Sequence, residues 1–173
     1  MFAKGRFAFA FYLAALSGIA LAASPPDTLK PPSGEVLAFQ AAARGVQIYE
    51  CRKTGDQYAW ALVGPEAELF DDGGAKIGRH FTGPTWEAAD GSRVVGKVAA
   101  KADAPDGKSV AWLLLTAASH EGAGRMADVT SVQRLDTQGG AAPATGCGAE
   151  HAGERTRSPY QANYLFYHPA PPK

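Results

Sequence analysis

The chain has 173 residues, of which 17 are basic and 17 acidic, and 46% are hydrophobic. The charged side chains form no basic stripe and no run of like charge, which argues against nucleic acid or anionic lipid as a partner. A chain of this length corresponds to one domain built around a single hydrophobic core.

The first 22 residues have the pattern of a cleaved signal peptide. Lys4 and Arg6 form a positive start, an apolar run follows, and Ala20-Leu21-Ala22 supplies small residues for a cleavage site. The apolar run is shorter than the about 20 residues that a membrane-spanning helix needs, and Pro25-Pro26 follows it closely. We therefore predict export to the periplasm or the medium, with no stable membrane insertion once residues 1–22 are removed.

Cys51 and Cys147 are the only cysteines. In an oxidising compartment such an even pair predicts one disulfide. A metal site is disfavoured because neither residue lies in a CxxC or CxxH pattern. Two free buried thiols are the other alternative.

Proline-rich segments at residues 23–34 and 169–173 predict an extended lead-in and a tail around one β-rich domain, residues 35–168. Within that domain, short runs of β-type residues alternate with Gly and Asp turns, as in antiparallel sandwiches and barrels. We predict a mainly all-β fold, a sandwich or a barrel with long loops and one disulfide. In chain order, strands are expected at residues 35–41, 46–51, 58–63, 76–81, 93–99, 110–117, 129–135 and 160–167.

Two segments depart from a simple alternation of strands and turns. The pair Arg44-Gly45 is expected to separate the first two strands, because glycine weakens a strand interior. The apolar run at residues 110–115 does not alternate, so it fits either a central strand buried on both faces or a short buried helix. Its shortness favours the strand.

The densest group of chemically active side chains lies in residues 80–92. If residues 82–89 form a loop, Trp86 can stack on a ligand while His80 and Glu87 make polar contacts. We take His80, Trp86, Glu87, Asp90 and Ser92 as candidate ligand-binding residues. The structural alternative is ordinary turn chemistry, a core indole and a solvated carboxylate.

Arg134 is the sixth candidate ligand-binding residue. On a strand it shares a face with Asp136, two residues further on. A surface ion pair between them is the expected arrangement, and a substrate clamp is the alternative.

No cofactor or metal is predicted. His80, Glu87 and Asp90 are suitable ligand types, but their spacing matches no known metal site. Residues 122–127 match the loose dinucleotide pattern GxGxxA, but no βαβ unit surrounds them.

Catalysis has little support in the residues. No GxSxG nucleophile elbow is present, and a disulfide would leave no thiolate to attack a substrate. Carboxylate pairs such as Glu66/Glu68 or Glu87/Asp90 remain possible acid–base partners only if the fold gives them the right separation. We therefore assign no catalytic residue and lean against an enzyme.

Several short segments occur in a recognisable order. They include Gly45-Val-Gln-Ile-Tyr-Glu-Cys51, Trp60 with Pro65-Glu-Ala67, Gly78 with His80, Gly83-Pro-Thr-Trp-Glu87, Asp90-Gly-Ser92, Trp112-Leu-Leu-Leu115, Val129 with Gln133-Arg134, Thr137-Gln-Gly-Gly140, Pro143, Gly146-Cys147 and Pro159-Tyr-Gln-Ala162. This order resembles a family of secreted domains of unknown function from bacteria and fungi, whose fungal members include appressorium-specific proteins. The resemblance spans nearly the whole chain after the signal peptide. It implies export and paired cysteines, and it implies no established activity.

These observations lead to one hypothesis and two alternatives. The leading hypothesis is a non-catalytic exported β-domain that binds a small molecule, a glycan or an envelope component. The first alternative is a hydrolase that uses Glu87 or Asp90 with His80. The second is an interaction protein of the envelope or of host contact. The sequence does not identify the ligand or partner.

Overall fold

The computed structural model describes residues 24–172, and the predicted signal peptide lies outside them. Within this range the chain forms one short 3-10 helix, η1 (Asp27–Leu29), and a second, η2 (Ala149–His151). The rest of the regular structure is β-sheet. The strands are β1 (Glu35–Thr54), β2 (Gln57–Phe70), β3 (Lys76–Phe81), β4 (Thr85–Ala88), β5 (Arg93–Ala102), β6 (Trp112–Glu121), β7 (Ser131–Gly139) and β8 (Arg155–Pro169).

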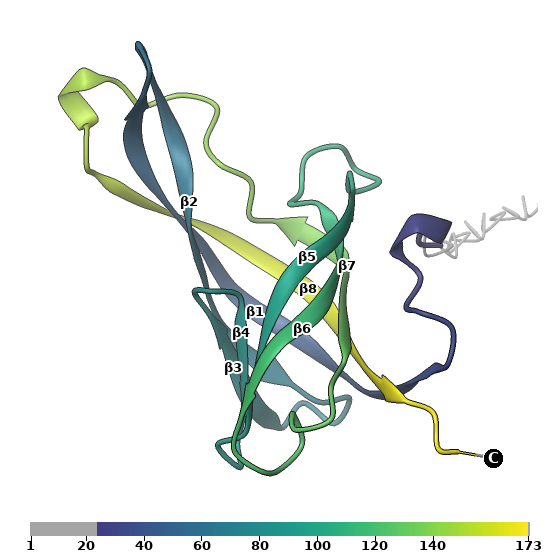
Figure 1. Cartoon of the computed structure of the whole chain (residues 1–173). Helices are drawn as coiled ribbons and strands as arrows, with labels where there is room; N and C mark the ends of the chain where they lie inside the picture. The colour runs from purple at the N-terminus through teal and green to yellow at the C-terminus, as the bar shows by residue number, and fades with distance from the viewer. Residues whose placement is uncertain (1–23, 173) are drawn as a thin grey trace, which may run out of the picture.

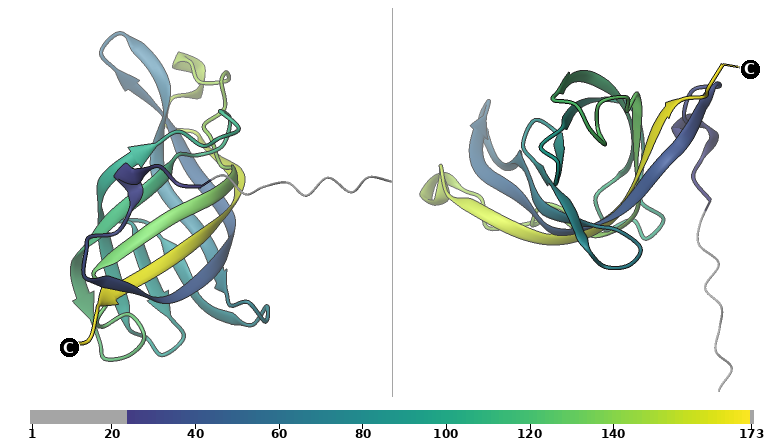
Figure 2. Two further views of the ribbon diagram at one scale, coloured as in Figure 1. Left: turned by 90° about the vertical axis from the view of Figure 1, so that its right-hand side faces the viewer. Right: turned by 90° about the horizontal axis from the view of Figure 1, so that it is seen from below.

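The strands form a closed antiparallel barrel (Figures 1 and 2). Each strand pairs with the next in the chain, and β8 returns to pair with β1 along most of its length. The prediction of an antiparallel all-β fold is confirmed, and of the two architectures considered the chain adopts the barrel. Because side chains alternate between the two faces of a strand, each strand contributes every second residue to the interior.

The expected break at Arg44-Gly45 is wrong. β1 runs through both residues without interruption and pairs with β2 on one side and β8 on the other. Glycine is needed at this position for a different reason: a Cβ at Gly45 would lie 2.2 Å from the backbone oxygen of Glu66. The residue therefore allows β2 to approach closely in mid-strand.

The β3–β4 hairpin is much shorter than its neighbours. β2 pairs with β3 only from Glu66 to Phe70, and β4 pairs with β5 only from Thr85 to Glu87. Beyond the hairpin, the first half of β2 and the second half of β5 have no partner on their facing sides. The barrel wall is therefore notched above this hairpin (Figure 1).

The β1–β2 hairpin extends past the barrel as an arm, beside the long connection between β7 and β8 (Figure 1). Several links hold this connection to the arm, among them a disulfide, a side-chain hydrogen bond and backbone hydrogen bonds between Cys51 and residues 153–154. Cys51 and Cys147 form a disulfide, which confirms that prediction. The indole nitrogen of Trp60 also donates a hydrogen bond to the backbone oxygen of Thr145, at 2.9 Å.

A small second core lies on the outside of the barrel. The lead-in segment crosses the outer face of β5 and β6 (Figure 2), where Leu29 of η1 is fully buried against Trp112 and Leu114. The Gln133 amide nitrogen donates a hydrogen bond to the Leu29 backbone oxygen. The lead-in is thus anchored by one helical turn instead of being extended throughout. The first four residues of β6, Trp112–Leu115, are covered on both faces, which explains why this run does not alternate.

No helix in the described part of the chain has the length and apolar character that crossing a bilayer requires.

Candidate functional site

The interior of the barrel is filled completely at one end. Val94, Val132 and Phe166 point inward there, and each is fully buried. The loop between β6 and β7, residues 122–130, adds Met126 and Val129 to the same core. We call this the closed end of the barrel.

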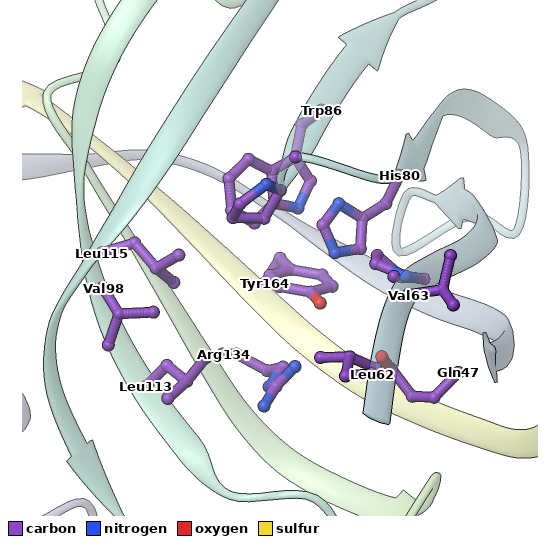
Figure 3. A pocket seen from close by; sticks show the side chains of 14 residues that line it. Gln47, Leu62, Val63, His80, Trp86, Val98, Leu113, Leu115, Arg134 and Tyr164 are labelled. Atoms are coloured by element: carbon purple, nitrogen blue, oxygen red, sulfur yellow. The ribbon is translucent and has the colours of Figure 1, made fainter. Parts of the chain in front are cut away.

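The opposite end of the interior contains a cavity of about 240 Å³. It opens at the notch above the β3–β4 hairpin, between β2 and β5. Leu62 and Val98 lie at this opening, and they are 56% and 50% exposed, unusually high values for large apolar side chains in this protein. Further in, most of the wall is apolar, with Leu113 and Leu115 among its members (Figure 3). We call this the cavity end.

Three aromatic rings separate the cavity from the closed end. The His80 and Trp86 rings are stacked, with centroids 4.5 Å apart, because β3 and β4 pair these two residues directly across the hairpin. Tyr164 of β8 meets the His80 ring edge-on at 5.0 Å (Figure 3). Gly96 of β5 makes room for the indole, since a Cβ there would lie 2.8 Å from Trp86 Cζ3. The stack is therefore a fixed floor beneath the cavity.

The protonation state of His80 follows from its surroundings. Burial lowers the pKa of His80 to about 3, so the ring is uncharged at neutral pH. Nδ1 lies 2.9 Å from the backbone oxygen of Thr85, and a carbonyl can only accept. Nδ1 therefore carries the proton, and Nε2 presents a lone pair.

Arg134 brings a permanent positive charge into the cavity wall. Nε and Nη2 both donate to the backbone oxygen of Ala111, at 3.0 and 2.8 Å, which fixes the plane of the guanidinium. No carboxylate lines the cavity. Burial raises the pKa of the Tyr164 hydroxyl, and the charge of Arg134 partly opposes that rise. The cavity therefore has a cationic group and no anionic one.

Two buried donors in the cavity wall lack a hydrogen-bond partner. They are the amide nitrogen of Gln47 and the indole nitrogen of Trp86, on side chains that are each 1% exposed. Buried polar groups in native proteins nearly always have a partner, so an unpartnered one calls for an explanation. Leaving a donor unsatisfied costs about 1–3 kcal/mol. Two such donors beside one cavity indicate that an acceptor belongs there.

The structure divides the six sequence-predicted residues into two groups. His80, Trp86 and Arg134 line the cavity together, although Arg134 comes from β7 on the far side of the barrel. The expectation that Trp86 lies on a loop differs from what is seen, since Thr85–Ala88 is strand β4 and its alternation turns the indole inward.

Glu87 lies on the outer surface. It follows Trp86 on the strand and therefore points the opposite way. Its carboxylate pairs with Arg79 at 2.8 Å and also with Arg93. Hydrogen bonds from these two guanidinium groups, Arg79 first, lower the pKa of Glu87. Glu87 and His80 thus face different spaces, which removes the geometry that an acid–base pair of the two would need.

Asp90 and Ser92 lie at the closed end and hold its loop in place. The Asp90 carboxylate accepts a hydrogen bond from the backbone nitrogen of Arg125 at 2.8 Å, and Ser92 Oγ accepts one from that of Met126 at 3.1 Å. These bonds fix the segment that inserts Met126 into the core. The contacts of Asp90 and Ser92 are therefore those of a structural turn.

The expected ion pair between Arg134 and Asp136 is wrong. The register of β7 against β8 shifts after Leu135, and Asp136 has a left-handed backbone with φ 50°. The irregularity breaks the alternation that would place the two side chains on one face. Asp136 instead accepts a hydrogen bond from Asn163 at 3.0 Å, while Arg134 points inward.

The sequence reasoning missed Gln47, Leu62 and Val98 as cavity residues. A signal existed for Gln47, which is a polar side chain at an inward position of a strand whose other inward residues are small or apolar. Leu62 and Val98 gave no such signal, because only the shortness of β3 and β4 brings them to an opening. No three ligand-type side chains gather as a metal ion would require within residues 24–172.

Fold and site together define a class of protein: an eight-stranded antiparallel barrel with one closed end and one ligand-sized interior cavity. Residues 32–168 match a family described as protein of unknown function, DUF3455, and the chain belongs to this family. No curated protein and no solved structure shows significant similarity to the chain. The predicted membership of a family without established activity is thereby confirmed.

Proposed function

We propose that this protein is an exported, non-catalytic binding protein that holds one small organic molecule inside its barrel. The observation that carries the proposal is the pair of unpartnered buried donors, Gln47 and Trp86, beside an open cavity. Eight-stranded barrels are just wide enough either to be filled by side chains or to hold one small ligand. Here side chains fill the closed end, and the cavity end keeps the space for a small ligand.

The groups in the cavity favour binding over hydrolysis. A general base works best when its pKa lies near the working pH, and the pKa of His80, about 3, is far below neutrality. The carboxylates that would serve as partners lie elsewhere: Glu66 pairs with Arg157 and Glu68 with Lys76 on the surface. A rigid aromatic stack and several hydrogen-bond donors are suited to binding a ligand without changing it chemically.

Export is supported by two independent features. The first 22 residues have the charge, apolar and small-residue order of a signal peptide. The Cys51–Cys147 disulfide belongs to an oxidising compartment. We therefore place the binding protein in the periplasm or outside the cell.

The experiment is mass spectrometry of the mature protein purified from its own host, under native and denaturing conditions. We expect an excess native mass that disappears on denaturation. Leu62→Asp, at the cavity mouth, should lose this mass because a charge there opposes apolar binding. The matched control is Leu37→Asp on β1, which is 49% exposed and does not line the cavity.

A ligand-free native mass, combined with no uptake of the neutral aromatic probe 1-naphthol, contradicts the proposal. Retention of the excess mass in Leu62→Asp together with its loss in Leu37→Asp would also contradict it, because the ligand would then lie on the outer surface near the start of β1.

A further inference from the structure

We infer that the ligand is an anion, specifically a compact apolar carboxylate, and that Arg134 is its counter-ion. This inference rests on the proposed function and narrows it to a ligand class. It is carried by an unbalanced charge, by the unpartnered donors beside it, and by the size of the apolar space.

Arg134 differs from every other arginine in residues 24–172. Of the eight arginines in this range, five form salt bridges with carboxylates on the surface. Two more, Arg44 and Arg125, lie over phenylalanine rings, at 5.2 and 5.0 Å. Arg134 has neither kind of partner, although it is half-buried in the wall of the cavity. A cation partly withdrawn from water is stabilised by a counter-ion, so the missing partner is expected to come from outside the chain.

The geometry of Arg134 leaves part of the guanidinium free. Nε and Nη2 are held by the backbone oxygen of Ala111. The guanidinium also lies close enough to the Tyr164 hydroxyl for a side-chain hydrogen bond, but no carboxylate among the described residues pairs with it, and its side chain lines the cavity. In Figure 3 the guanidinium lies below Tyr164 and between Leu113 and Leu62, close to the entrance. A carboxylate entering between β2 and β5 would meet this group early.

The neighbouring polar groups are mostly donors. Gln47 and Trp86 each offer a buried N–H without a partner, and a carboxylate offers only acceptor sites. Hydrogen bonds between an ionised acceptor and N–H donors are about twice as strong as neutral ones. No acidic side chain lines the cavity to repel an anion. A cationic ligand would meet the charge of Arg134 and would find no carboxylate in the cavity wall to pair with.

The apolar space sets the size of the ligand. A cavity of about 150 Å³ is large enough to hold benzene. The cavity here, at about 240 Å³, has room for roughly a second ring or a medium-length alkyl chain. Leu113, Leu115 and Val98 supply an apolar wall for that body. The best fit is therefore one carboxylate on an apolar group of about ten carbons.

The test uses pairs of probes that differ only in charge. Isothermal titration calorimetry at pH 7 compares 2-naphthoate with 2-naphthamide, and octanoate with octanamide, on the mature wild-type protein. We expect each acid to bind about tenfold or more tightly than its amide, the difference expected from one charge-assisted contact. Arg134→Gln should bring the ratio of the two affinities close to one, because it weakens the binding of the acids alone. Arg157→Gln, a matched change in a surface ion pair, should leave the ratio intact.

The outcomes separate the two proposals. Equal or tighter binding of the amides overturns the anionic class while leaving the binding cavity in place, and so does a full acid preference in Arg134→Gln. Binding of none of the four probes overturns the proposed function and the inference with it. The comparison of acid and amide on the wild-type protein needs no variant, so it remains decisive even if Arg134→Gln fails to fold.

Discussion

The closed end and the cavity end of the barrel interior have the same eight strands around them and differ in what fills the space. At the closed end, Phe166 stacks on Phe39 at 4.4 Å, and the loop carrying Met126 completes the packing. At the cavity end, Gln47 and Arg134 occupy inward positions that an apolar side chain could fill. The barrel interior thus has a tightly packed layer that stabilises the fold and a separate layer with open space, where we propose that the ligand binds. Structural hydrogen bonds stabilise the closed end, and hydrogen-bond donors without a partner distinguish the cavity end.

The largest expected effect is the loss of stability when a packed leucine side chain is truncated. Leu69→Ala at the closed end should lower the free energy of unfolding by about 2–5 kcal/mol, because Leu69 is fully buried and its removal leaves a void. Leu113→Ala, the same change at the cavity end, should cost clearly less, since Leu113 already borders empty space. Urea denaturation followed by tryptophan fluorescence measures both. Equal costs would mean that the cavity end is as tightly packed as the closed end.

A smaller effect on stability is expected when acid protonates Asp90 at the closed end. Hydrogen bonds from Ser92 and from the Arg125 backbone hold the pKa of Asp90 at about 2, below its ordinary value of 3.8. Because the pKa is depressed in the folded state, the stabilisation is present above pH 3.8 and is lost as the pH falls towards 2. Asp90→Asn should therefore melt below the wild type at neutral pH, and the two melting temperatures should converge over this acidic window.

Asp56→Asn, in the exposed turn between β1 and β2, is the control for Asp90→Asn and should melt like the wild type throughout. Thermal scans by circular dichroism across the pH range check both variants. A constant gap between Asp90→Asn and the wild type down to pH 2 would show that the Asp90 charge does not hold the loop.

The smallest expected effect is at Gln47. Gln47→Met replaces an unsatisfied buried amide by an apolar group of similar length, so stability should change by less than about 1 kcal/mol and in the favourable direction. Val132→Thr makes the opposite kind of change at the closed end and should cost about 1–3 kcal/mol, because it buries a hydroxyl. A large loss of stability in Gln47→Met would assign that amide a structural role.

Much of the fold could be predicted from local patterns. The cysteine pair predicted the disulfide, and β-type runs between turns predicted most strands and the antiparallel arrangement. The clearest omission was β4, which has only four residues and follows the Gly83-Pro84 turn so closely that it has no separate signal. That omission also hid the division of residues 80–92. Once Thr85–Ala88 is a strand, simple alternation turns Trp86 inward and Glu87 outward.

By itself, the sequence determined an all-β chain with one disulfide, and it drew attention to His80, Trp86 and Arg134 by their chemical type. Such conclusions depend on composition and on spacing between neighbours, which the chain carries locally. Only the tertiary structure decided that these three residues surround one cavity, that Gln47 joins them, and that Asp90 and Ser92 lie at the other end. The physical reason is that closure of the barrel brings β3, β4, β7 and β8 to a common interior, and this depends on register and strand length. A single bulge in β7 was enough to separate Arg134 from Asp136 and leave its charge without a partner.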